Sequence, residues 1–159
     1  MKRVSTIFLQ VVLVLIGLSA VAILIEFPLV EGRAVDLDLV SIYTDPFILY
    51  AYATSVAFFV ALYKAFRLLG FIRTNKVFSA PAVKALRCIK FCAIVISVAI
   101  ALAGIYIKLF HDKADDSAGF LALSILTTFA SIVIATAAAV FQQLLQKAID
   151  MKSENELTI

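Results

Sequence analysis

Two cysteines, Cys88 and Cys92, and one histidine, His111, are the residues best suited to metal or nucleophilic chemistry in this chain. The cysteines are four residues apart, so they share one face if the segment is a helix. A structural zinc site usually has four ligands, and two thiols supply only half of them. We therefore interpret both cysteines as small packing residues, with redox or acylation chemistry as the alternative. No cofactor and no metal is predicted.

Other catalytic patterns are missing from the sequence. It contains no Gly-rich phosphate loop, no nucleophile elbow and no paired His/Glu metal motif. Each of these motifs positions a phosphate, a nucleophile or a metal, so their absence removes the usual starting points for catalysis. The chain is predicted not to be an enzyme.

The composition indicates that the chain is embedded in a lipid membrane. Its 159 residues are 64% hydrophobic and their mean hydropathy is +1.06, whereas soluble domains are only about half apolar. A chain of this length cannot bury so much apolar surface in a single aqueous core, because small domains have too little interior. A membrane protein is therefore expected.

Four continuous apolar runs are long enough to cross a bilayer, which takes about 20 residues per helix. They cover residues 4–25, 47–69, 89–109 and 120–145. Continuous runs favour helices over barrel strands, in which apolar and polar residues alternate. The sequence predicts an all-α polytopic membrane protein with four transmembrane helices in a bundle. It forms one domain, 1–159, with a basic turn at 70–88 and a tail at 146–159.

Charge is unevenly distributed between the ends of these spans. Eleven of the 14 basic residues lie before the first span, around the second connection or in the tail. The first and third loops hold the other three, together with eight acidic residues. Loops rich in Lys and Arg tend to stay in the cytoplasm. The prediction is a multi-pass protein of the plasma (inner) membrane with both termini cytoplasmic, N-in/C-in.

The first span allows a second interpretation. Met-Lys-Arg, an apolar run and Ala20-Val21-Ala22 resemble a cleavable signal peptide. The apolar run continues through Ile25, beyond the position of that cleavage site, which favours a retained anchor.

Local signals predict where two helices begin. Asp45-Pro46 is typical of an N-cap followed by proline at the first helical position. Ser79 is a suitable N-cap for a helix that reaches Leu109. Three tyrosines are expected near the outer membrane interface, where amphipathic rings are favoured: Tyr43, Tyr50 and Tyr52.

Small residues recur at a spacing of four in the third and fourth spans. Such ridges let helices approach closely in lipid. The helix-packing candidates are Ala93, Ser97 and Ala101 in the third span and Thr127, Ser131, Ala135 and Ala139 in the fourth. We predict that the two faces meet within one bundle, with self-association into a homo-oligomer as the alternative.

The strongest charged feature is the basic stretch of the second connection. Its candidate contact residues are Arg73, Lys76, Lys84, Arg87 and Lys90. The first interpretation is anchoring on anionic lipid heads, at about 1 kcal/mol per basic residue near the surface. The alternative is docking of an acidic protein partner. Direct nucleic-acid binding is not expected, because a recognisable reader fold is missing.

The chain ends on a polar stretch, SENELTI. The candidate recognition residues are Glu154, Asn155, Glu156, Leu157, Thr158 and Ile159. One hypothesis is that the last helix continues, docks under the bundle and pairs its acids with the basic stretch. The other is that a partner's groove binds the terminus.

Several segments occur together in a known family. They are Met-Lys-Arg at the start and residues 75–79, 83–90 and 148–159. Over nearly its whole length the chain resembles the small bacterial four-helix membrane proteins of the DUF2975 family. The resemblance implies a plasma-membrane protein and supplies no established activity or catalytic residues. It also implies a cytoplasmic partner, a small helix-turn-helix regulator.

Three functional hypotheses follow. The first is a regulatory or interaction protein that presents its basic turn and tail to a soluble partner. The second is a small transporter or oligomeric channel, lined by Ser97, Thr127, Thr128 and Ser131. Ionisable residues near mid-membrane are missing, which counts against ion coupling. The third, an enzyme acting on lipid, rests only on Glu26, His111 and the aspartates expected on the same side.

Overall fold

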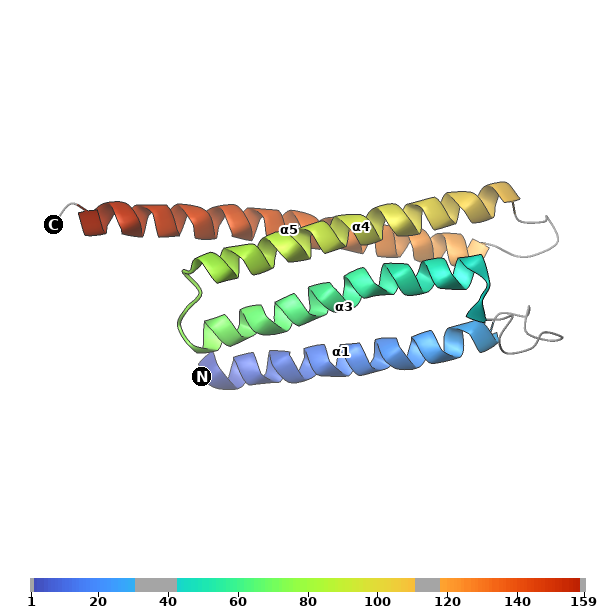
Figure 1. The fold of residues 1–159 in the computed structure, drawn as a ribbon, viewed down its shortest axis with the longest axis horizontal. Helices are drawn as coiled ribbons and strands as arrows, with labels where there is room; N and C mark the ends of the chain where they lie inside the picture. The colour runs from blue at the N-terminus through green and yellow to red at the C-terminus, as the bar shows by residue number, and fades with distance from the viewer. Residues whose placement is uncertain (1, 31–42, 111–117, 158–159) are drawn as a thin grey trace.

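The computed structural model describes residues 2–30, 43–110 and 118–157. This part of the chain is built of α1 (Lys2–Val30), α3 (Pro46–Arg73), α4 (Ala80–Phe110) and α5 (Ala118–Leu157). All four helices are long and apolar enough to cross a membrane, and their axes are nearly parallel (Figure 1). The prediction of four such helices is confirmed, and the described residues are all-α. Each helix extends beyond the apolar run that predicted it.

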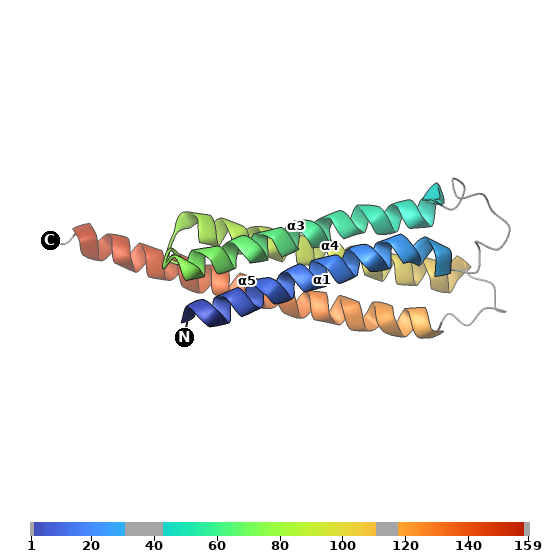
Figure 2. The ribbon, with the colours of Figure 1, turned by 90° about the horizontal axis from the view of Figure 1, so that it is seen from below.

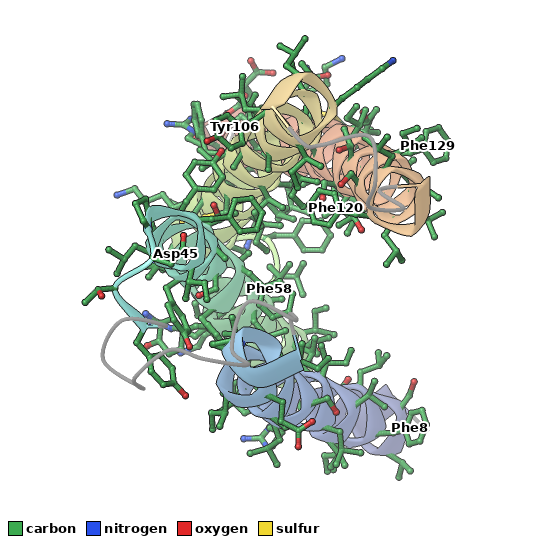
Figure 3. All side chains as sticks on the ribbon, turned by 90° about the vertical axis from the view of Figure 1, so that its right-hand side faces the viewer. Phe8, Asp45, Phe58, Tyr106, Phe120 and Phe129 are labelled. Atoms are coloured by element: carbon green, nitrogen blue, oxygen red, sulfur yellow. The ribbon has the colours of Figure 1, made fainter. Side chains whose placement is uncertain are left out.

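The helices pack in the order in which they occur in the chain. Contacts concentrate in the pairs α1–α3, α3–α4 and α4–α5. Viewed end-on, the helices form an arc with α1 and α5 at its two ends (Figure 3). Large apolar side chains such as Phe8 and Phe129 point away from the arc and are about two-thirds exposed, at 67% and 65%. This inside-out distribution suits a protein whose solvent is lipid.

The start of α3 follows the prediction. The Asp45 carboxylate accepts a hydrogen bond from the Phe47 amide at 2.8 Å, and Pro46 occupies the first helical position. The start of α4 also agrees with the prediction of Ser79 as the residue before the helix. The Ala82 and Val83 amides donate to the Ser79 carbonyl, which is the first hydrogen-bonded turn of the helix. The Ser79 hydroxyl itself donates to the Lys76 carbonyl at 2.6 Å.

A proline inside α1 creates a gap that a tyrosine of α3 fills. Pro28 is fully buried within α1 and has no amide hydrogen to donate. In a regular helix that amide would bond the carbonyl four residues earlier, which belongs to Leu24. The Tyr52 hydroxyl donates to the Leu24 carbonyl instead, at 2.9 Å. The orphaned acceptor of α1 is therefore satisfied by the neighbouring helix.

Two further contacts connect α3 to its neighbours. The Tyr50 hydroxyl donates to the Ala99 carbonyl of α4 at 2.7 Å. On the other side, α1 approaches α3 closely at Gly17, where an added Cβ would lie 3.0 Å from the Leu62 side chain. Tyr50 and Tyr52 thus connect helices, a role that their predicted position at the interface does not reveal.

Replacing Tyr52 with phenylalanine should destabilise the fold by about 1–3 kcal/mol, because the Leu24 carbonyl is left without a donor. Tyr50→Phe should cost less, about 0.6 kcal/mol, since it removes one interhelical hydrogen bond from a carbonyl within regular helix. The free energy of unfolding in mixed micelles measures both effects. Tyr63→Phe, at an exposed tyrosine of the same helix, is the matched control.

Restoring the missing amide should remove most of the Tyr52 effect. In a Pro28→Ala background, residue 28 can donate to the Leu24 carbonyl, so Tyr52→Phe should then cost little. The double-mutant cycle measures this coupling. Equal losses in both backgrounds would contradict the assignment of Tyr52 to the gap left by Pro28.

Candidate functional site

The connection between α3 and α4 is a short, well-defined turn. The sequence places it at 70–88, whereas the structure confines it to residues 74–79. Asn75 has a positive φ of 56°, a conformation that asparagine tolerates better than most residues. The Lys76 amide donates to the Phe71 carbonyl and the Asn75 amide to the Ile72 carbonyl. This pair of bonds is a Schellman motif, which satisfies the last carbonyls of α3.

The structure brings the predicted basic residues to this end of the molecule. Arg73 ends α3, Lys76 lies in the turn, and Lys84, Arg87 and Lys90 follow along the first three turns of α4. The first four are exposed. Lys90 is half-buried, with its ammonium 5.4 Å from the centre of the Phe91 ring. These residues, named here the basic cluster, belong to the end of the molecule at which α1 begins and past which α5 projects (Figure 1).

The tail does not fold back on the basic cluster. Helix α5 continues without a break to Leu157 and projects past the turn (Figures 1 and 2). Residues 120–157 contain neither glycine nor proline, and the Gln146 amide supports the helix by donating to the Asp150 carboxylate at 2.9 Å. Bending the tail under the bundle would require breaking this helix. The intramolecular clasp expected from charge alone is therefore wrong for the part of the tail that the structure describes.

The tail candidates are only partly described. Glu154 and Asn155 are exposed on the last turns of α5. Glu156 and Leu157 belong to the same helix. Thr158 and Ile159 lie outside the described residues, as does His111.

An apolar stripe runs along the second half of α5, from within the predicted span 120–145 to the projecting end. It comprises Phe141, Leu144, Ala148 and Met151, which are separated by steps of three, four and three. Steps of this kind keep residues on one face of a helix. Phe141, Leu144 and Met151 are 58%, 56% and 64% exposed. Because about 20 residues of α5 suffice to cross the bilayer core, the far end of this stripe lies beyond the lipid tails.

Helices α4 and α5 meet along small residues, as predicted, but the register differs. Ala93, Ser97, Ser131 and Ala135 are buried. Thr127, in contrast, is exposed, and Ala101 and Ala139 are half-buried. The buried positions of α5 include Ser124 and Ala138, which the sequence reasoning missed.

The register differs because an α-helix has 3.6 residues per turn. A strict spacing of four drifts around the helix, whereas alternating steps of four and three remain on one face. The α5 contact follows such steps through Ser124, Thr128, Ser131, Ala135 and Ala138. On α4, an added Cβ at Gly104 would lie 3.5 Å from the Ser124 Cβ. A 3.5-residue period could have revealed this seam from sequence.

The described residues contain no group of three or more His, Cys, Asp or Glu side chains placed to hold a metal ion. Cys88 and Cys92 are free, half-buried thiols of α4. Glu26 is exposed near the end of α1. The chemistry that these residues offer is thus recognition by charge and by apolar contact at the end of the molecule where the turn lies.

Similar proteins are known by sequence. The model of a family described as protein of unknown function (DUF2975) matches residues 29–159. A protein of Bacillus subtilis (strain 168), described as uncharacterized membrane protein YoaS, is 44% identical over 161 residues that cover the whole of both chains. No solved structure matches the chain.

Substituting Gly104 with leucine should force α4 and α5 apart, because the close contact with Ser124 leaves no space for the side chain. We expect a loss of about 1–3 kcal/mol in the free energy of unfolding, measured in mixed micelles. Gly119→Leu on α5, where an added Cβ meets nothing within 4 Å, should change it by about 0.5 kcal/mol or less. Equal effects of the two substitutions would contradict the close packing of α4 against α5 at Gly104.

Proposed function

The chain belongs to the DUF2975 family of proteins of unknown function, and we propose that it is a membrane-embedded regulatory or interaction protein without catalytic activity. Its surface for a soluble partner comprises the basic cluster and the projecting end of α5. The observation that carries the proposal is that the apolar stripe of α5 continues into that projection. Its far end, at Met151, is exposed.

We propose that this surface faces the cytoplasm, with the protein in the plasma membrane and both termini inside. The arrangement of the helices supports this orientation. The start of α1, the α3–α4 turn and the end of α5 lie at one end of the molecule (Figure 1), and eleven of the 14 basic residues belong to these regions. Because basic loops tend to stay in the cytoplasm, this distribution supports a cytoplasmic location for that end.

The two parts of the surface suit different features of a partner. An exposed stripe at steps of three and four is the pattern by which an amphipathic helix enters a groove. The basic cluster adds attraction for acidic side chains, and also for anionic lipid heads, which should hold the turn close to the membrane surface. A small helix-turn-helix regulator is the first partner to test, because the family resemblance implies one.

The transporter hypothesis gains no comparable support. Two of its four lining candidates, Ser97 and Ser131, are buried in the seam between α4 and α5, and Thr127 is exposed. Residues that pack two helices together are poorly placed to line a route through the same chain. We therefore propose the interaction role alone.

The proposed orientation can be measured with reporter fusions. Alkaline phosphatase, which is active only outside the cytoplasm, should be active when fused within residues 31–42 or 111–117 and inactive after Asn75 or Asn155. A green fluorescent protein fusion after Asn155 should fluoresce. The opposite pattern would place the basic cluster outside and overturn the proposed surface.

Partner capture should depend on the stripe. We expect Met151→Glu to reduce cross-linked capture of a soluble partner by about tenfold, as loss of a central apolar contact does in other interfaces. Deleting residues 153–159 should also reduce capture. Gln143→Glu is the matched control, because it adds the same charge to the polar face of the same helix. Identical sets of captured proteins from all four forms of the chain would contradict the proposal.

A further inference from the structure

Two thiols of α4 lie on one helix face near the turn that connects α3 and α4. Cys88 and Cys92 are one turn apart on α4, and both are free. The Cys92 thiol interacts with the Cys88 thiol and lies within electrostatic range of Lys64 of α3. The antiparallel course of the helices explains the meeting, since Lys64 precedes the turn by about as many residues as Cys88 follows it. None of these three residues belongs to the proposed docking surface.

The number and kind of ligands limit which ion this cluster suits. Thiolates are soft ligands that select ions such as Cu(I), Zn(II) or iron–sulfur clusters. Structural zinc takes four ligands, and the described residues offer no third His, Cys, Asp or Glu here. A soft monovalent ion can be held by two sulfurs alone. On one helix face, side chains four residues apart have their Cβ atoms about 5–6 Å from each other, which leaves space for one ion between the sulfurs.

We propose that Cys88 and Cys92 form a two-thiolate site for a soft monovalent cation of the Cu(I) class, with Lys64 as its charge-balancing residue. On binding, both thiols release their protons to solvent and two sulfur–metal bonds form, without change of oxidation state. Two thiolates and one monovalent cation carry a net charge of −1. The ammonium of Lys64 neutralises it, which matters because an uncompensated charge is costly beside the membrane interior.

The helix supports this site before any ion is bound. Both cysteines lie within an unbroken stretch of α4, so their spacing does not have to form on binding. Both residues are half-buried, so neither is fully enclosed by its neighbours. A packing role alone gives no reason for an ammonium group of the neighbouring helix to lie within range of the thiols.

Competition for Cu(I) tests the site. The full-length chain, reduced and purified in detergent without oxygen, is titrated with Cu(I) against a chromophoric Cu(I) chelator. We expect one Cu(I) per chain, with thiolate-to-copper absorption in the ultraviolet. Cys88→Ser and Cys92→Ser should each weaken binding by at least about a hundredfold, since loss of an outer-shell group alone costs 10–100-fold. No competition by the unaltered chain, or unchanged affinity in either variant, would overturn the proposal.

Three further variants separate geometry and charge from mere thiol content. The double variant Cys92→Ser/Ile94→Cys keeps two thiols but places them on different faces of α4, so it should bind as weakly as the single variants. Lys64→Gln should weaken binding by about tenfold, through the loss of a charge beside the thiolates. Arg67→Gln should have little effect, because that guanidinium lies over the Phe71 ring. Full affinity in the double variant would overturn the site, and equal effects of the two α3 substitutions would overturn the role of Lys64.

Discussion

Lipid offers the backbone no hydrogen-bond partner, and this constraint governs the whole structure. Long helices satisfy this constraint along their length with their own backbone hydrogen bonds. The places that need explanation are therefore those where a backbone hydrogen bond is missing. Asp45 caps the start of α3, and a Schellman turn satisfies its last carbonyls. Pro28 interrupts the backbone hydrogen bonds of α1, and the Tyr52 hydroxyl of α3 supplies the missing donor. A contact between two helices therefore completes the backbone hydrogen bonding of one of them.

Packing between the helices follows from the same solvent. Since lipid tails are as apolar as leucine, burying large apolar side chains gives little gain, and close contact through small residues becomes more effective. The buried residues of α5 are accordingly serine and alanine, and Gly104 of α4 faces Ser124. Leu86 and Ile89 are buried on α4, whereas most of the other large apolar side chains are exposed toward lipid. Helices α3 and α4 each have two packed neighbours, and so hold the arc together.

Hydropathy was sufficient to predict the four helices, because length and apolar content are properties of each segment alone. Asp45-Pro46 and Ser79 predicted two helix starts for the same reason. Contacts between distant segments were not predictable in this way. Pro28 lies beyond the apolar run that marked the first span, so its pairing with Tyr52 left no signal. For the tail, charge complementarity favoured folding back, but an unbroken run of good helix formers was the stronger determinant. Residue spacing identified the two cysteines, and only the antiparallel packing of α3 on α4 brought Lys64 to their level.

The length of α5 has a mechanical consequence. Its 40 residues correspond to about 60 Å of helix, roughly twice the thickness of the bilayer core. Near its start the Phe120 ring rests against Phe47 of α3, with ring centres 6.3 Å apart, and beyond the turn no other described helix runs alongside it (Figures 1 and 2). Because α5 is packed along α4, its projecting end follows any tilt of that pair. A tilt of about 10° would carry the far end of α5 through roughly 10 Å, given that helix length.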